Sequence, residues 1–98
     1  MVQKSREIEA IKEALTQALG LQIRFNANWD GQPDSIGISH ADYDRHLAYV
    51  CSYSSGYFVS LERRARDGDV APYRDGGEHN DLAIAEVVEV IRAHMRAQ

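Results

Sequence analysis

Hydrophobic residues near the start of the chain recur at helical spacing. The positions that lie three or four residues apart are Ile8, Ile11, Leu15 and Leu19. Charged and polar residues fill most places between them, so the pattern predicts an amphipathic helix over residues 5–19. Ser5 is its expected N-cap, and Gly20 is its expected C-terminal stop.

The pattern then changes to alternation. In LQIRFNANWD every second residue from Leu21 to Trp29 is apolar, which predicts a strand with one buried and one wet face. The turn residues of GQPD end this strand. The same pattern, interrupted by turn residues, predicts four further strands, over about 35–40, 45–53, 57–65 and 70–74.

Helical spacing returns in the last segment. Its apolar stripe consists of Leu82, Ala85, Val88, Ile91 and Met95. Asn80 or Asp81 is the expected cap of a helix over about 81–97. The order of elements predicts a single α+β domain over residues 1–98: an N-terminal helix, a four- to five-stranded antiparallel meander and a C-terminal helix, with both helices on one face.

Turn lengths predict how the central strands pair. A four-residue loop in the first hairpin sets Ile38 opposite Leu47, and a three-residue SSG loop in the next sets Tyr53 opposite Tyr57. This register places one set of third-strand residues on the core face: Leu47, Tyr49, Cys51 and Tyr53. Because side chains alternate along a strand, a slip of one residue would exchange the two faces completely.

The composition fits an ordinary soluble protein. Among 98 residues, 44% are hydrophobic and 27% are charged. No apolar run is long enough to span a bilayer, and the charged start of the chain lacks the features of a secretory leader. The lone Cys51 cannot form a disulfide within the chain, which favours a cytoplasmic location.

The charge balance narrows the classes of partner. The chain carries 15 acidic and 11 basic residues, which gives a net charge of −4. A nucleic-acid backbone is disfavoured because no basic excess is available to displace its counterions. A basic protein surface suits this charge better.

The stretch SHADYDRHLAYV carries histidine or aspartate at four alternate positions: His40, Asp42, Asp44 and His46. On one extended strand these side chains would share a face and could bind a metal. However, the predicted turn falls among them, with His40 on the core side and His46 on the wet side. Aspartate is also a favoured turn residue, so the stretch is interpreted as a polar turn without a bound metal.

Other chemistry-bearing residues also have structural interpretations. RDGDVAPYRDGGEHND contains five carboxylates, but their glycine-rich surroundings indicate a hairpin turn and the loop leading into the last helix. Cys51 is expected to be an inert core residue, and Ser54 and Ser55 are turn residues. The sequence therefore predicts neither a catalytic site nor a cofactor, and the protein is not expected to be an enzyme.

Surface residues are the remaining candidates for function. If both helices cover one face, the other face of the sheet is predicted to carry Arg24, Asn26, Asn28, His46, Val50, Ser52, Phe58, Ser60 and Glu62. Trp29, Tyr43 and Tyr73 are predicted to lie at its rim beside aspartates. Aromatic anchors next to carboxylates suit binding to a basic protein partner.

The order and spacing of these parts resemble a group of small bacterial immunity proteins that neutralise polymorphic toxins. The likeness rests on a leading helix, then LGLQIRFNANWDG, then DSIGISHADYDRHLAYVCSYSSGYFVSLERRARDGD, and a helix ending in EVVEVIRAHM. It is strongest with the TriTu type, which is associated with ADP-ribosyltransferase toxins. The chain departs from that pattern in its polar APYRDGGEH segment.

The resemblance implies a cytoplasmic immunity protein that blocks the active site of a cognate toxin, with a basic cleft on the toxin as its target. The expected partner-binding residues are Asn26, Asn28, Trp29, Asp30, Tyr43, Phe58, Asp67, Asp69, Tyr73 and Asp75. Two alternatives stay open. One is a dimeric secretion-chaperone-like or assembly adaptor that uses a sheet edge, and the other is a small ligand- or metal-binding domain.

Overall fold

The chain folds into two helices and one five-stranded antiparallel sheet. The computed structural model describes residues 4–26, 31–42, 46–64 and 73–96, with side chains except at 63–64 and 73–76. The elements, in chain order, are α1 (Arg6–Leu19), the 3₁₀ turn η1 (Gly20–Gln22), β1 (Ile23–Asn26), β2 (Ser35–His40), β3 (His46–Tyr53), β4 (Gly56–Arg64), β5 (Tyr73–Leu82) and α2 (Ile84–Arg96). The strands lie side by side in sequence order, which confirms the predicted α+β meander.

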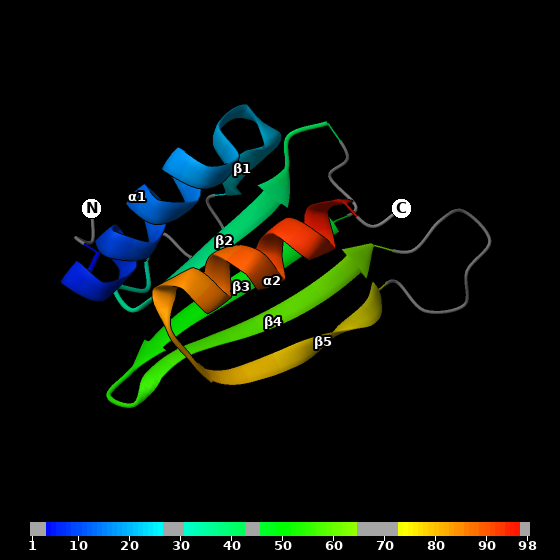
Figure 1. Ribbon diagram of the computed structural model, residues 1–98. Helices are drawn as coiled ribbons and strands as arrows, with labels where there is room; N and C mark the ends of the chain where they lie inside the picture. Colours follow the sequence, from blue (N-terminus) through cyan, green and yellow to red (C-terminus); the bar gives the residue numbers. More distant parts are fainter. Residues whose placement is uncertain (1–3, 27–30, 43–45, 65–72, 97–98) are drawn as a thin grey trace.

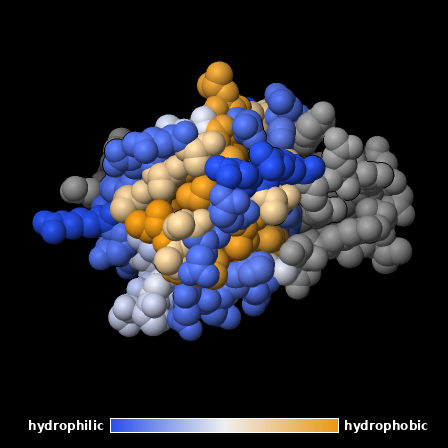
Figure 2. Space-filling model, viewed as in Figure 1, coloured by the Kyte–Doolittle hydropathy of each residue, from blue (hydrophilic) through white to orange (hydrophobic). Residues whose placement is uncertain are grey.

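Both helices lie across the same face of the sheet (Figure 1). The core forms between this face and the buried sides of α1 and α2. Its fully buried larger side chains are Ile8, Ile11, Leu15, Ile38, Val50, Val59, Val87 and Ile91. In the view of the helix-covered face, hydrophobic residues gather in the middle and hydrophilic residues surround them (Figure 2). Neither described helix is long and apolar enough to cross a membrane.

The start of α1 is tied to the segment before β2. The Ser5 hydroxyl accepts a hydrogen bond from the Ile8 amide at 3.3 Å, as predicted for an N-cap. The Ser5 amide donates to the Pro33 carbonyl at 2.9 Å. The Lys4 ammonium donates to the carbonyls of Gln32 and Ser35 at 2.6 and 2.8 Å. These bonds fix the start of α1 against the segment that leads into β2.

The register of the central hairpins differs from the prediction by one residue. Ile38 opposes Ala48, and Tyr53 opposes Gly56 across a two-residue Ser54–Ser55 turn. As a result Ala48 and Val50 face the helices, and the residues expected there face away. The predicted positions of His46, Val50 and Ser52 on the wet face were therefore wrong. The physical reason is that both faces of β3 carry apolar residues, so alternation alone does not select one of them.

The boundaries near the last helix also differ from the prediction. β5 continues through Gly-Gly-Glu-His-Asn-Asp to Leu82, where a loop was expected, and α2 begins at Ile84. The Ala83 amide donates to the Glu86 carboxylate at 2.9 Å, so Glu86 rather than Asn80 or Asp81 caps the helix. Leu21, expected on the buried face of the first strand, lies in η1 and is 97% exposed.

The β3–β4 turn interlocks with the end of β5. Gly56 has a φ of +147°, and a Cβ built there would lie 3.1 Å from both the Asp81 carbonyl carbon and the Leu82 oxygen. Asp81 itself has a φ of 56°, and its carboxylate accepts a hydrogen bond from the Ser55 hydroxyl at 2.7 Å. Glycine at position 56 therefore allows two backbone segments to approach closely.

We expect Gly56→Ala to lower the free energy of unfolding by about 1–3 kcal/mol, because the new methyl group meets backbone atoms and the φ is unfavourable. Urea unfolding measures this loss. Gly31→Ala is the matched control, since a Cβ at Gly31 meets nothing within 4 Å. Equal stability of the two variants would contradict the close approach of Gly56 to the backbone of Asp81 and Leu82.

The Tyr57 hydroxyl on β4 donates to the Glu7 carbonyl on α1 at 2.9 Å. Burial, followed by the charge of Glu7, raises the pKa of Tyr57 above its ordinary value. The stability linked to this group is therefore fully present below the unfolded-state pKa of about 10 and is lost as the pH rises through the higher folded-state pKa.

We expect Tyr57→Phe to reduce the free energy of unfolding at neutral pH by about 1 kcal/mol, because it removes the hydrogen bond. The same variant should lose less stability than the wild type when the pH is raised above about 10. Urea unfolding at neutral and alkaline pH tests both effects. An identical alkaline loss in the two proteins would show that Tyr57 does not carry it.

Candidate functional site

The face of the sheet opposite the helices is the candidate site, and we refer to it as the open face. No described helix or strand packs on it. Alternation along β1 to β4 assigns to it the described residues Arg24, Asn26, Ser35, Gly37, Ser39, Leu47, Tyr49, Cys51, Tyr53, Phe58, Ser60 and Glu62. Small residues occupy β2, and larger ones occupy β3 and β4. The larger side chains of the open face therefore lie on its β3–β4 side.

Three aromatic rings form a row on that side of the open face. The Phe58 ring lies between those of Tyr49 and Tyr53, at centroid distances of 6.5 and 6.4 Å. Both contacts are edge-to-face, a favourable geometry for aromatic pairs. Tyr53 is 61% exposed, whereas Tyr49 and Phe58 are half-buried. This aromatic row presents the Tyr53 ring and parts of the Tyr49 and Phe58 rings to solvent.

A hydrogen-bonded triangle supports one end of the aromatic row. The Tyr49 hydroxyl lies 2.7 Å from the Cys51 sulfur and 3.0 Å from the Ser35 hydroxyl. The Ser35 hydroxyl lies 3.0 Å from the same sulfur. Cys51 and Ser35 are 8% and 5% exposed, so the triangle lies beneath the surface. It holds the Tyr49 ring in one orientation against the sheet.

The triangle also affects how the tyrosines ionise. Burial is the largest cause that raises the pKa of Tyr49, and its hydrogen bond to Cys51 is the next. For Tyr53 the charge of Cys51 is the largest cause of a raised pKa, ahead of hydrogen bonding with the same residue. Both phenols therefore remain neutral hydrogen-bonding groups at physiological pH.

Only part of the predicted partner-binding set can be placed. Asn26 and Phe58 lie on the open face as predicted, and the Asn26 amide donates to the Ser39 hydroxyl at 3.2 Å. The backbones of Tyr73 and Asp75 belong to β5, but their side chains lie outside the description. The residues that lie entirely outside the described part of the chain are Asn28, Trp29, Asp30, Tyr43, Asp67 and Asp69.

The residues that sequence reasoning missed are Tyr49, Tyr53 and Cys51. All three were expected on the core face, and Cys51 is indeed buried, but on the open side. A two-residue turn, considered in place of the predicted three-residue SSG loop, would have identified them. With Ser54–Ser55 as the whole loop, Val50 faces Val59 and Ala48 faces Leu61, which is an equally apolar core.

A second cluster of side chains lies on the helix-covered face. His40, His46 and His94 form a row, with ring centroids 6.1 Å apart for the first pair and 5.5 Å apart for the second. His46 and His94 are 9% and 5% exposed. His40 and His46 are the residues next to the register partners Ser39 and Leu47 of β2 and β3. His94 reaches them from the last turn of α2.

Hydrogen bonds of His94 and His40 indicate which of their ring nitrogens donate and which accept. The His94 Nε2 atom lies 3.0 Å from the Glu62 carbonyl oxygen, which only accepts, so Nε2 carries a proton. The His40 Nδ1 atom accepts from the Asp42 amide at 3.0 Å and so presents a lone pair.

We assign no metal to the histidine row. The Nδ1 atom of His40 is engaged by the Asp42 amide. Within the described ranges, no group of three histidine, cysteine, aspartate or glutamate side chains has an arrangement that could hold a metal ion.

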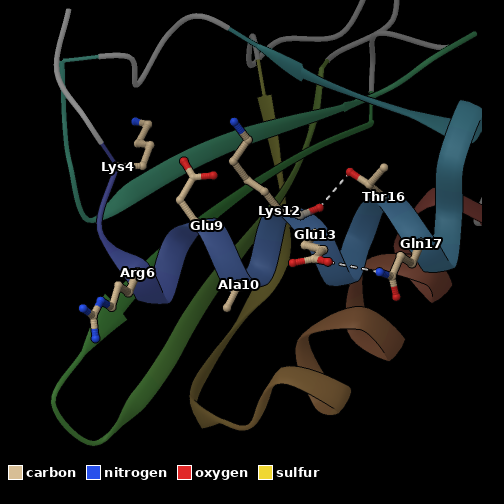
Figure 3. Close-up of a pocket in the computed structure, with 8 residues that line it drawn as sticks. All are labelled: Lys4, Arg6, Glu9, Ala10, Lys12, Glu13, Thr16 and Gln17. Carbon is tan, nitrogen blue, oxygen red and sulfur yellow. Dashed lines mark hydrogen bonds between the residues drawn. The ribbon is translucent and has the colours of Figure 1, made fainter.

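A shallow hollow of about 680 Å³ runs along the outer side of α1 (Figure 3). Its lining residues all come from one segment: Lys4, Arg6, Glu9, Ala10, Lys12, Glu13, Thr16 and Gln17. Thr16 donates to the Lys12 carbonyl at 2.7 Å, and Gln17 donates to the Glu13 carboxylate at 3.3 Å. These local bonds within one helix are typical of a solvated surface, so we do not assign a ligand to the hollow.

Comparison with known proteins gave no match: no family model, curated protein or solved structure is similar enough to place this chain in a family.

We expect Cys51→Ala to lower the pKa of Tyr53 toward its ordinary value, because the thiol is the main cause of its rise. The pKa of Tyr49 should fall less, since burial remains. Alkaline titration followed by tyrosinate absorbance measures both. Ser52→Ala, on the opposite side of the same strand, is the control that should leave the curve unchanged. If Cys51→Ala left the titration curve unchanged, the result would contradict the contact between Cys51 and the two tyrosines.

Proposed function

We propose that this protein is an immunity protein, which binds a cognate bacterial toxin and blocks its active site without catalysing a reaction itself. The observation that carries the proposal is the aromatic row, a rigid apolar strip on a face that no described element covers. The sequence resemblance to polymorphic-toxin immunity proteins supplies the class of partner.

The aromatic row has the properties of binding anchors. Tyrosine and phenylalanine bury large areas on association and lose little conformational entropy, and a few such residues commonly supply most of the binding energy. The Ser35–Cys51 pair holds the Tyr49 hydroxyl in place before any partner arrives. This preorganisation reduces the entropy lost on binding.

Charge supports a basic surface on the partner. The chain has a net charge of −4. On the open face Glu62 is exposed, and Asp67, Asp69 and Asp75 follow it in the sequence. In this proposal the acidic residues raise the association rate, and the aromatic row determines how long the complex lasts.

The adaptor alternative uses the same surface differently. Two copies that pack open face to open face would bury both aromatic rows and leave none for another protein. Sedimentation equilibrium distinguishes these cases, because a monomer at working concentration supports the toxin-binding proposal and a stable dimer supports the adaptor.

The test of the proposal begins with capture of the tagged protein, followed by identification of its toxin and measurement of affinity. We expect Tyr53→Ala and Phe58→Ala each to weaken binding by about tenfold or more, because each removes an anchor. Both variants should also reduce inhibition of the toxin activity in proportion to the lost affinity.

The matched control is Leu21→Ser, which removes an exposed apolar side chain in η1, outside the sheet. It should bind and inhibit as the wild type does. If Leu21→Ser abolished binding while Tyr53→Ala and Phe58→Ala retained it, the open face would not be the contact surface.

A further inference from the structure

The histidine row joins three elements that are far apart in the sequence. It contains His40 from the end of β2, His46 from the start of β3 and His94 from the last turn of α2. Three of the four histidines in the chain therefore meet at one end of the core. This cluster plays no part in the proposed function and lies on the opposite face of the sheet.

The row is built for the neutral form of its rings. Protonation of His40 at Nδ1 would remove the acceptor for the Asp42 amide and place two donors against each other. Protonation of His46 or His94 would put charge on side chains with less than a tenth of their surface exposed. Two charged rings at 5.5 or 6.1 Å would also repel each other.

The charged groups around the row come from each neighbouring element. α2 contributes Arg96 and also Arg92, which is paired with Glu89 at 2.7 Å. β4 places Arg63 opposite His46 in register, and the Glu62 side chain is exposed. The residue after β2 that bonds to His40, Asp42, is exposed as well, and Ile23 opposes His40 on β1. α1, which packs against α2, contributes the apolar Ile11, Leu15 and Leu19.

Two opposing effects act on His94. The carbonyls at the C-terminal end of α2 favour a positive charge there. Burial and the neighbouring ring oppose a positive charge on His94. These two effects act on every ring of the row, whereas the helix carbonyls act on His94 alone. Burial and the contacts between the rings therefore favour neutral histidines.

We propose that the histidine row is an acid-sensitive contact that holds the C-terminal half of α2 on the sheet. When its rings are neutral, the His94–Glu62 hydrogen bond and the ring contacts close this end of the core. When the rings take up protons, the contacts become repulsive, and α2 loosens from β3 and β4. The open face lies on the other side of the sheet and takes no part in this response to pH.

The first test is urea unfolding at two pH values. Histidines of an unfolded chain take up protons near pH 6.5, so stability should be full above this value and fall below it. We expect the unfolding equilibrium constant of the wild type to rise about tenfold or more between pH about 7.5 and about 5.

Two variants separate the row from other titrating groups. His94→Gln retains a donor for the Glu62 carbonyl but cannot be protonated, so most of the pH dependence should disappear. His79→Gln removes an exposed histidine of β5 outside the row and should behave as the wild type does. The proposal is overturned if the wild type is equally or more stable at the lower pH, or if His94→Gln and His79→Gln are equally acid-sensitive.

Hydrogen exchange on the wild-type protein gives a result that does not depend on a variant folding. Acidification from pH about 7.5 to about 5, with correction for the intrinsic exchange rates, should reduce protection of α2 amides more than that of α1 amides. Equal changes in both helices would place the acid-sensitive contact elsewhere and overturn the proposal.

Discussion

The register of β3 against its neighbours is the constraint on which the rest of the structure depends. A strand has a side-chain period of two, so a single-residue shift would exchange the faces of every β3 residue. The observed register places Ala48 and Val50 beneath the helices. It thereby places Tyr49 and Tyr53 on the open face and brings His46 into contact with His94. One pairing choice generates both the aromatic row and the histidine row.

The elements themselves could be predicted from the sequence, because their patterns are strong. The spacing of apolar residues in α1, the N-cap Ser5 and the order of the strands were confirmed. The register could not be predicted, since β3 has apolar residues on both faces and a Ser-Ser turn carries none of the usual hairpin signals. The same ambiguity concealed two members of the aromatic row, whereas Phe58 was correctly placed.

The end of the sheet was mispredicted for a different reason. Glycine, asparagine and aspartate usually indicate a loop, yet β5 includes all three in Gly77, Asn80 and Asp81. Register shifts along β4–β5 and the positive φ of Asp81 accommodate them in a bent edge strand. The histidine row was beyond prediction because almost all of β3, the whole of β4 and β5, and most of α2 lie between His46 and His94 in the chain. Only tertiary packing brings them together.

The hydrogen bond between Tyr57 and Glu7 has a consequence for the order in which the protein assembles. Its two ends are 50 residues apart in the chain, and α1 also packs against α2, which lies still further along. The strands of the meander pair with sequence neighbours, so each hairpin closes only a short loop. During synthesis α1 emerges first but has a complete apolar surface to cover its buried side only after β4 and α2 have been made. The helix that begins the described chain is therefore among the last parts of the structure to become stably packed.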